Sequence, residues 1–311
     1  MQLTYFGANS WLLEVGGMRV LLDPWLVGSL TFGGQGWFFE GINPNLGPIP
    51  GDIDLILLSQ GLPDHAHRPT LERLDRQIPV VGSLGAARLA TRLGYTQVTP
   101  LRPGELCQVE PLAPPKRRLG LGPAAPTLGL EIRAFAGAPV PQVENAYLLT
   151  QLGDGRTLYY EPHGFAAADL LEMGPVDVVI NPVVDLMIPG VGPLVKGRSA
   201  ALPLAQALQP RYFLPTAAGG NIQYRGLLDR ILRSAGTVAE FQEQLAAAGL
   251  STQVLDPIPG QPQPLIFEDP QDTLAPDSPN TLGILGQWWQ QAQGFSRRLW
   301  DRPPSASGSQ P

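Results

Sequence analysis

Cysteine, histidine and charged residues are all scarce in this chain. Its 311 residues include one cysteine, Cys107, and three histidines, and only 15% are charged. A single cysteine excludes an internal disulfide and fits a reducing compartment. The formal net charge of −6 provides no basic footprint for a phosphate backbone, so no nucleic acid is expected as a partner.

Signals for export and membrane insertion are also missing. The first residues, MQLTYFGANSWLLEVGG, lack the basic start, the uninterrupted apolar run and the small-residue cleavage site of a signal peptide. No window approaches the roughly 18 uncharged apolar residues that a membrane span needs. We therefore expect a cytoplasmic protein.

Hydrophobic residues make up 43% of the chain, which is ample for a packed core. Short runs of β-formers, Leu3–Phe6, Ser10–Val15 and Arg19–Leu22, are separated by glycines and predict a meander of antiparallel strands. The segment Gly28–Gly51 is rich in glycine and proline and carries several aromatic residues. It predicts a long functional loop.

The rest of residues 1–255 alternates between strand and helix patterns, which predicts an α/β domain. The expected strands are Asp54–Leu58, Pro79–Gly82, Gln97–Thr99, Leu130–Phe135, Ala146–Thr150, Thr157–Tyr160, Val176–Ile180 and Tyr212–Pro215. One helix is expected to begin at Pro69. Five more are expected over Leu84–Leu93, Ala166–Glu172, Ala200–Leu208, Leu227–Ser234 and Val238–Ala248. A glycine- and proline-rich loop is expected over Met187–Gly197.

Three segments follow this domain. Residues 256–280 are dense in proline and predict a linker or an extended chain lying on the surface. Residues 281–302 have tryptophan and leucine at helical spacing and predict an amphipathic helix, which would dock on its own domain, on a partner or on a membrane surface. Residues 303–311 predict a disordered tail.

The most informative segment for chemistry is LLSQGLPDHAH, residues 57–67. A buried strand is expected to deliver Ser59, after which a turn carries Asp64 beside His65. Carboxylate and imidazole on one turn can face a shared ion, and this pair suits zinc, manganese or iron. The alternative is that Asp64 and His65 only cap a helix and hold the turn.

This segment resembles the metallo-β-lactamase superfamily, whose hallmark is a strand followed by Thr/Ser-His-x-His-x-Asp-His. Ser59, Asp64 and His65 match that pattern, while Gln60 and Leu62 stand where the first two histidines belong. The opening LTYFGANSWLLEVGGMRVLLDPWL resembles the ascorbate-lactonase-like branch, in which the aspartate matching Asp23 supports the metal-binding turn. The resemblance implies an αβ/βα four-layer sandwich.

Other ligand positions of the family are replaced. Pro162 falls on the bridging aspartate, and neither Ala136–Pro139 nor the region of Ala217 holds the expected histidine. The segments SQGLPDHAH, VENAYLLT, YYEPHG and LPTAAGG are similar to those of a cyanobacterial and plastid branch with a degenerate metal motif.

The three histidines all lie in the two segments expected to meet at the pocket. We expect a remodelled centre of Asp64, His65, Glu161 and His163 that holds a divalent ion, with zinc foremost and manganese or iron as alternatives. A metal-free acid–base pair of His65 and Glu161 is the other hypothesis. Supporting residues are expected at Asp23, Ser59 and Gln60, and the substrate pocket is expected to be lined by Trp37, Phe38, Phe39 and Thr216.

Two functions are consistent with this sequence. One is a metal-dependent hydrolase of a small ester, lactone or phosphodiester-type substrate, with Asp64, His65 and Glu161 as catalytic residues. The other is an inactive member of the fold that serves as a small-molecule binder or a protein-interaction scaffold. The remaining histidine, His67, is expected at an exposed helix start.

Overall fold

The structure is a computed structural model of the 311-residue chain, and it describes residues 1–111, 129–139, 144–217 and 219–267. The chain divides into two compact units, Met1–Leu265 and Ile266–Pro311, and the fold described below is that of the first. The predicted C-terminal helix and tail lie outside the described residues. Among the helices of the described chain, none has the length and apolar character needed to cross a bilayer.

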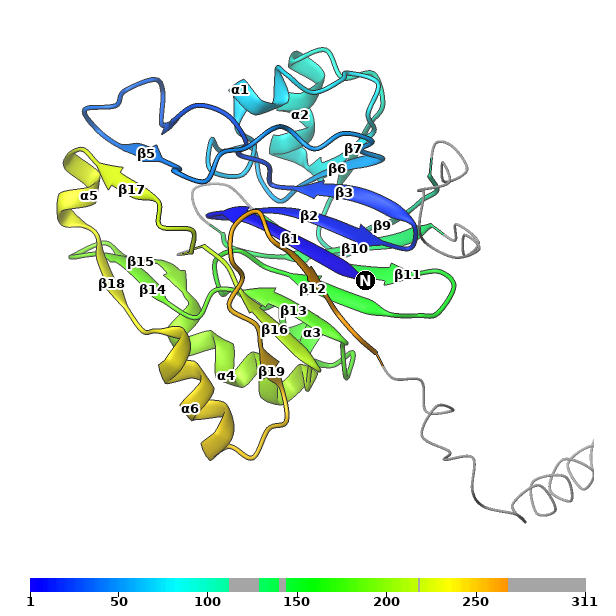
Figure 1. The fold of residues 1–311 in the computed structure, drawn as a ribbon, viewed down its shortest axis with the longest axis vertical. Helices are drawn as coiled ribbons and strands as arrows, with labels where there is room; N and C mark the ends of the chain where they lie inside the picture. Colours follow the sequence, from blue (N-terminus) through cyan, green and yellow to red (C-terminus); the bar gives the residue numbers. More distant parts are fainter. Residues whose placement is uncertain (112–128, 140–143, 218, 268–311) are drawn as a thin grey trace, which may run out of the picture. The chain divides into compact units, whose positions relative to one another are not determined.

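Two seven-stranded sheets form the centre of the fold (Figure 1). The first has the order β20-β1-β2-β3-β6-β7-β8 and the second the order β19-β16-β13-β12-β11-β10-β9. The strands of the first are β1 (Gln2–Gly7), β2 (Ser10–Val15), β3 (Met18–Leu22), β6 (Leu55–Leu58), β7 (Val80–Ser83), β8 (Val98–Leu101) and β20 (Pro262–Pro264). Those of the second are β9 (Leu106–Val109), β10 (Leu130–Ala136), β11 (Asn145–Gln151), β12 (Thr157–Tyr160), β13 (Val178–Asn181), β16 (Tyr212–Pro215) and β19 (Gln253–Val254).

Helices cover the outer face of each sheet (Figure 1). Helices α1 (Arg68–Leu71) and α2 (Leu84–Arg92) pack on the first sheet in one apolar cluster. Helices α3 (Ala168–Leu171), α4 (Gly197–Leu208) and α6 (Val238–Ala247) pack on the second sheet in another. The predicted αβ/βα four-layer sandwich is therefore confirmed.

The strand patterns explain the pairing. Strands β1, β2 and β3 pair antiparallel through tight glycine turns, as the meander prediction requires. Strand β6 carries the apolar run Leu55–Leu58, which is buried at every position, and it pairs parallel with β3 and β7. A run without polar alternation is typical of a strand buried on both faces. Its carboxyl end therefore delivers the next residues to the interior edge of the sheet.

Two segments predicted as loops contain strands. Within Met187–Gly197 the chain forms a hairpin of β14 (Asp185–Ile188) and β15 (Gly192–Lys196), joined by β18 (Arg233–Ala235). Within Gly28–Gly51 lie β4 (Leu30–Thr31) and β5 (Glu40–Ile42), which pair with each other. Strand β5 also pairs with β17 (Gln223–Arg225), which lies beside the short helix α5 (Leu227–Ile231). Glycine and proline mark the turns of these hairpins, but partners distant in sequence complete them.

Candidate metal centre

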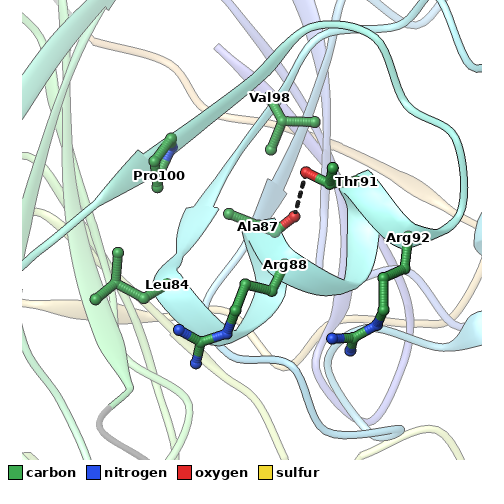
Figure 2. A pocket seen from close by; sticks show the side chains of 7 residues that line it. All are labelled: Leu84, Ala87, Arg88, Thr91, Arg92, Val98 and Pro100. Atoms are coloured by element: carbon green, nitrogen blue, oxygen red, sulfur yellow. Dashed lines mark hydrogen bonds between the residues drawn. The ribbon is translucent and has the colours of Figure 1, made fainter.

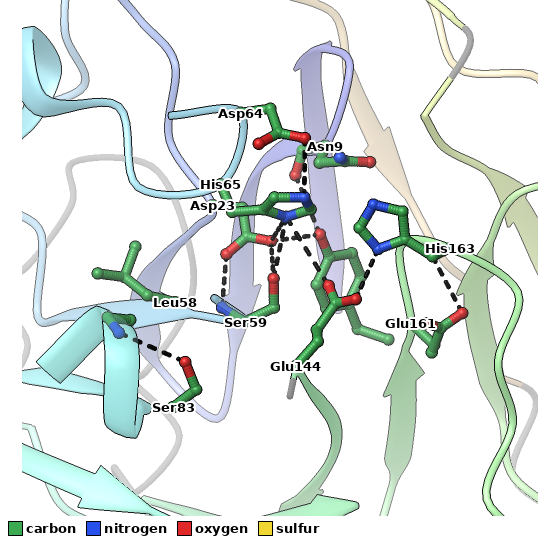
Figure 3. Close-up of polar contacts among 12 residues, drawn as sticks. Asn9, Asp23, Leu58, Ser59, Asp64, His65, Ser83, Glu144, Glu161 and His163 are labelled. Carbon is green, nitrogen blue, oxygen red and sulfur yellow. Dashed lines mark hydrogen bonds and ion pairs between the residues drawn. The ribbon is translucent and has the colours of Figure 1, made fainter. Parts of the chain in front are cut away.

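The candidate site lies where strand ends of the two sheets meet. The backbone N–H of Asn145 donates to the carbonyl of Ser59 at 3.0 Å, and the hydroxyl of Tyr147 donates to the carbonyl of Leu58 at 2.8 Å. These bonds fix the end of β6 against the start of β11. Residues that follow β3 and β6 therefore face residues that flank β11 and β12, as Figure 3 shows.

Asp23 anchors the first half of the site. It follows β3 in a left-handed conformation, with φ of 42°, and is fully buried. Its Oδ1 accepts the backbone N–H of Ser59 at 2.7 Å. Its Oδ2 accepts the hydroxyls of Ser59 and Tyr160 and the Nδ1–H of His65, the last at 2.8 Å. Asp23 thus joins the end of β3 to the end of β6 and to the ring of His65.

The Ser59, His65 and Asp23 side chains do not form a nucleophile relay. The Ser59 hydroxyl lies 3.0 Å from Nδ1 of His65, the same ring nitrogen that bonds to Asp23. A serine nucleophile needs the imidazole between hydroxyl and carboxylate, with one ring nitrogen for each. Ser59 is also fully buried, so its hydroxyl serves the hydrogen-bond network.

The turn after β6 presents Asp64 and His65 together. The carbonyl of Leu62 accepts the N–H groups of His65 and Ala66 at 3.0 and 2.7 Å, which closes the turn. Oδ2 of Asp64 lies 3.2 Å from Nε2 of His65, within ion-pair distance but without hydrogen-bond alignment. Nε2 of His65 and Oδ1 of Asp64 are buried atoms without a hydrogen-bond partner in the described chain.

The second sheet supplies Glu144, Glu161 and His163. Oε2 of Glu144 accepts Nδ1–H of His163 at 2.6 Å, and its Oε1 lies 3.9 Å from Nδ1 of His65. Oε2 of Glu161 accepts backbone N–H groups from His163, Gly164 and Phe165. Gly164 is needed there because its φ is +80° and a Cβ would lie 2.8 Å from the backbone of Lys196.

Asp64, His65 and His163 fit a divalent cation. One ligand atom from each lies within 4.8 Å of the others, so small movements would bring all three to the roughly 2.0–2.2 Å of zinc ligation. A carboxylate accepts from Nδ1–H of each histidine, which leaves each Nε2 with its lone pair. Carboxylates behind metal-bound histidines orient the rings and raise their basicity.

The charges of the site change its proton affinities. Burial alone would lower the pKa of His65, but Asp64 and Asp23 outweigh it and raise that pKa well above the usual value. Burial would also lower the pKa of His163, but the neighbouring Glu144 carboxylate outweighs this effect and the pKa is raised. Burial and the neighbouring Glu144 raise the pKa of Glu161 to about 7. Burial would also raise the pKa of Asp64, but His65 lowers it overall.

The structure brings the four predicted residues Asp64, His65, Glu161 and His163 into one cluster, in which the rings of the two histidines lie 4.9 Å apart (Figure 3). Sequence reasoning missed Glu144, which binds His163. The sequence signal for Glu144 is an acidic residue just before the predicted strand Ala146–Thr150. No histidine lies near it in the sequence to indicate a metal site.

The predicted residues Gln60 and Thr216 belong to neither candidate ligand group of the described chain. Gln60 is buried, and its Oε1 has no partner in the described chain. The hydroxyl of Thr216 accepts from Trp11 and donates to the carbonyl of Ala8, which fixes β2 to the segment after β16. The backbone N–H of Ala217 also donates to the carbonyl of Ala8, at 2.9 Å.

Of the three aromatic residues predicted to line the pocket, Trp37 is 69% exposed and its ring lies 6.0 Å from that of Phe38. Phe39 is buried with Trp25 in an apolar cluster that Phe38 borders, and its ring stacks on that of Tyr224. His67 does begin helix α1, but the predicted exposure is wrong, because the ring is buried and bonds to Thr70 and Ser29.

A shallow groove on the outer side of the first sheet lies apart from these residues. It is lined by residues of α2 and β8 and their flanks, with Arg88 and Arg92 along one side and Leu84 and Pro100 opposite (Figure 2). None of its lining residues belongs to the histidine cluster. Its lining residues include no histidine, cysteine or carboxylate.

Comparisons with known proteins identify the fold and the family of this chain. No curated protein matches the chain. Among solved structures, Igni18, a novel metallo hydrolase from the archaeon Ignicoccus hospitalis, is 18% identical with a TM-score of 0.55 and covers 86% of this chain and 99% of its own. The isothiocyanate hydrolase from Delia radicum gut bacteria is 15% identical with a TM-score of 0.58, covering 85% and 99%.

A third structure, the metallo-beta-lactamase fold protein YhfI from Bacillus subtilis, is 14% identical with a TM-score of 0.51, covering 85% and 99%. Identities this low establish the fold alone. The family model of the beta-lactamase superfamily domain matches residues 2–217, which is more than half of the chain. The chain therefore belongs to the metallo-β-lactamase superfamily.

Proposed function

We propose that this protein is a metal-dependent hydrolase whose cation is held by Asp64, His65 and His163. The observation that carries the proposal is the pair of imidazoles, each with Nδ1 fixed by a buried carboxylate, beside a third ligand with an unpartnered oxygen. Structural side chains in a core are normally satisfied. Unpartnered ligand atoms converging on one point are typical of a binding centre.

A divalent cation at this point would supply Lewis-acid polarisation of the substrate and a lowered pKa for water. The protein residues supply orientation and a proton acceptor. Asp23 and Glu144 hold the two rings in place. Glu161 keeps Oε2 on three backbone N–H groups and leaves Oε1 unpartnered, so Oε1 is the candidate proton acceptor.

We infer that a small substrate reaches this centre past Asp64. Its side chain is 27% exposed and that of His163 is 13% exposed, whereas those of His65 and Glu144 are fully buried. The family resemblance suggests an ester, lactone or phosphodiester-type bond. Solved relatives named as a metallo hydrolase and an isothiocyanate hydrolase support hydrolysis as the reaction class. We also propose a cytoplasmic location, from the sequence alone.

The test is metal analysis of protein purified without chelators, followed by single substitutions. Wild-type protein should carry about one divalent ion per chain. His65→Ala and His163→Ala should lose it, together with any activity found against panels of esters, lactones and phosphodiesters. His67→Ala is the matched control, because His67 is buried in the same loop but bonds to Thr70 and Ser29. It should keep the ion.

Wild-type protein without stoichiometric metal, whose activity survives His65→Ala and His163→Ala, would rule out the proposal. Metal bound by wild-type protein without turnover of any substrate would favour the second hypothesis, a binding scaffold built on this fold.

A further inference from the structure

Two glutamates of the site have an arrangement that the proposed hydrolase centre does not explain. Glu144 and Glu161 are both fully buried, and Oε1 of each has no hydrogen-bond partner in the described chain. His163 lies with them, and one ligand atom from each of the three lies within 4.8 Å of the others. Burying an unpaired carboxylate is expensive, so two adjacent ones need a positive partner.

The described surroundings do not supply enough positive charge. Four carboxylates lie in the network, and their hydrogen bonds and ion pairs in the described chain involve His65 and His163 but no lysine or arginine. Even with both imidazoles protonated, a formal charge of −2 would remain. A bound cation or added protons must neutralise it, and the converging unpartnered oxygens favour a cation.

We propose that Glu144, Glu161 and His163 form a second, carboxylate-rich cation position that competes with the Asp64–His65–His163 position for His163. The inference rests on the proposed function through this shared histidine. It differs from a two-metal centre because only one of the positions is filled at a time.

The exclusion follows from the chemistry of the imidazole ring. A neutral imidazole carries a proton on one nitrogen and a lone pair on the other. With Nδ1–H donating to Glu144, as in the structure, Nε2 of His163 is available to the first position. A cation among Glu144 and Glu161 would take the lone pair of Nδ1 and leave the proton on Nε2. Filling both positions through His163 would require an imidazolate, a ring with no proton on either nitrogen.

The two positions should prefer different metals. The first offers two imidazoles and one carboxylate, a set that suits zinc. The second offers two carboxylates and one imidazole, and oxygen-rich sets suit harder cations such as manganese. We therefore expect Zn²⁺ and Mn²⁺ to depend on different residues of one centre.

The experiment measures Zn²⁺ affinity by chelator competition and Mn²⁺ affinity by electron paramagnetic resonance on the full chain. Glu161→Gln should weaken Mn²⁺ binding by at least about 100-fold, beyond the loss typical of an outer partner, and leave Zn²⁺ binding within about threefold. Asp64→Asn should weaken Zn²⁺ binding by at least about 100-fold and leave Mn²⁺ binding within about threefold. Glu172→Gln, an exposed glutamate, should change neither. One Zn²⁺ per chain should displace bound Mn²⁺ completely.

Several results would overturn the inference. They are loss of Mn²⁺ binding in Asp64→Asn but not in Glu161→Gln, Zn²⁺ and Mn²⁺ bound together at two ions per chain, or no Mn²⁺ binding by wild-type protein. Retained Zn²⁺ binding by Glu161→Gln shows that this variant is folded. A wild-type protein that binds Mn²⁺ but not Zn²⁺ would contradict the first position while supporting the second, so the two proposals fail separately.

Discussion

Among the residues of the site, carboxylates decide what the histidines can do. Asp23 and Glu144 each accept from Nδ1–H of one histidine, so the tautomer of both rings is set by residues that lie outside the Asp64–His65–His163 ligand set. Both carboxylates are fully buried. Replacing either would therefore disturb the orientation of a ring as well as a charge.

The pKa shifts predict an unusual pH dependence of stability for the metal-free protein. The folded-state pKa of Glu161 is about 7, against an ordinary 4.5, so the folded state binds more protons than the unfolded state between these values. Stability should fall by up to about 3 kcal/mol as pH rises through this window. His65 and His163, with raised pKa values, add stability below pH 6.5 that is lost as pH rises further.

Urea denaturation in the presence of a chelator measures this effect at about pH 5 and about pH 8. Glu161→Gln cannot titrate, so its stability should change less between the two conditions than that of wild-type protein. Equal stability of wild-type protein at both pH values would contradict the shifts.

Part of this site could be predicted from sequence. Asp64 and His65 follow a buried strand in a recognisable turn, and Glu161 and His163 follow another, so strand order alone indicated that they meet. Glu144 could not be found in this way, because it precedes a strand and bonds to a residue 19 positions away. Only the pairing of β11 with β12 brings it beside His163.

Among the elements, local signals predicted some strands well. Strands β2, β12 and β16 have the predicted bounds, because β-branched and aromatic runs end at clear turn residues. The β14–β15 hairpin was missed, since Pro193 and its glycines indicate a loop when read without their partners. The pairing of β14 with β18 depends on residues about fifty positions later, and no local pattern carries that information.

Strand β20 closes one edge of the first sheet. Pro262–Pro264 pairs antiparallel with Gln2–Thr4, and the N–H of Leu265 donates to the carbonyl of Met1 at 2.9 Å. Proline at two of three positions is compatible only with an edge strand. The segment predicted as a linker or an extended chain lying on the surface therefore includes an edge strand of the first sheet.

This edge gives a stability prediction. Leu265 is 5% exposed, so Leu265→Ala should lower the free energy of unfolding by about 2–3 kcal/mol. Ile258→Ala is the matched control, because Ile258 is 59% exposed in the same proline-rich stretch, and should change it by less than about 0.5 kcal/mol. Chemical denaturation measures both. Equal effects of the two substitutions would show that β20 contributes little.

At the scale of the whole molecule, the order of elements predicted an α/β domain. The four-layer sandwich was implied by the family resemblance of LLSQGLPDHAH and of the opening strands. The pairing of β20 with β1 and the pairing of β5 with β17 were beyond prediction, because each joins segments separated by more than a hundred residues.

Metal should stabilise the whole first unit, because Asp64 and His65 come from one sheet and His163 from the other. Zn²⁺ at about 100 times its Kd should add about 2.7 kcal/mol, which corresponds to a rise in Tm of about 5–10 °C for a chain of this size. Scanning calorimetry with and without chelator measures it. His163→Ala should show no rise, and a wild-type Tm unaffected by Zn²⁺ would contradict the prediction.

The two ligand sets also differ in when they can exist. Glu144, Glu161 and His163 all flank strands β11 and β12 of the second sheet, so this set is complete once that sheet has folded. The other set needs the turn carrying Asp64 and His65, and forms only after the two sheets dock. A cation present during synthesis would therefore meet the carboxylates first, and could pass to the histidine-rich position only in the last step of assembly.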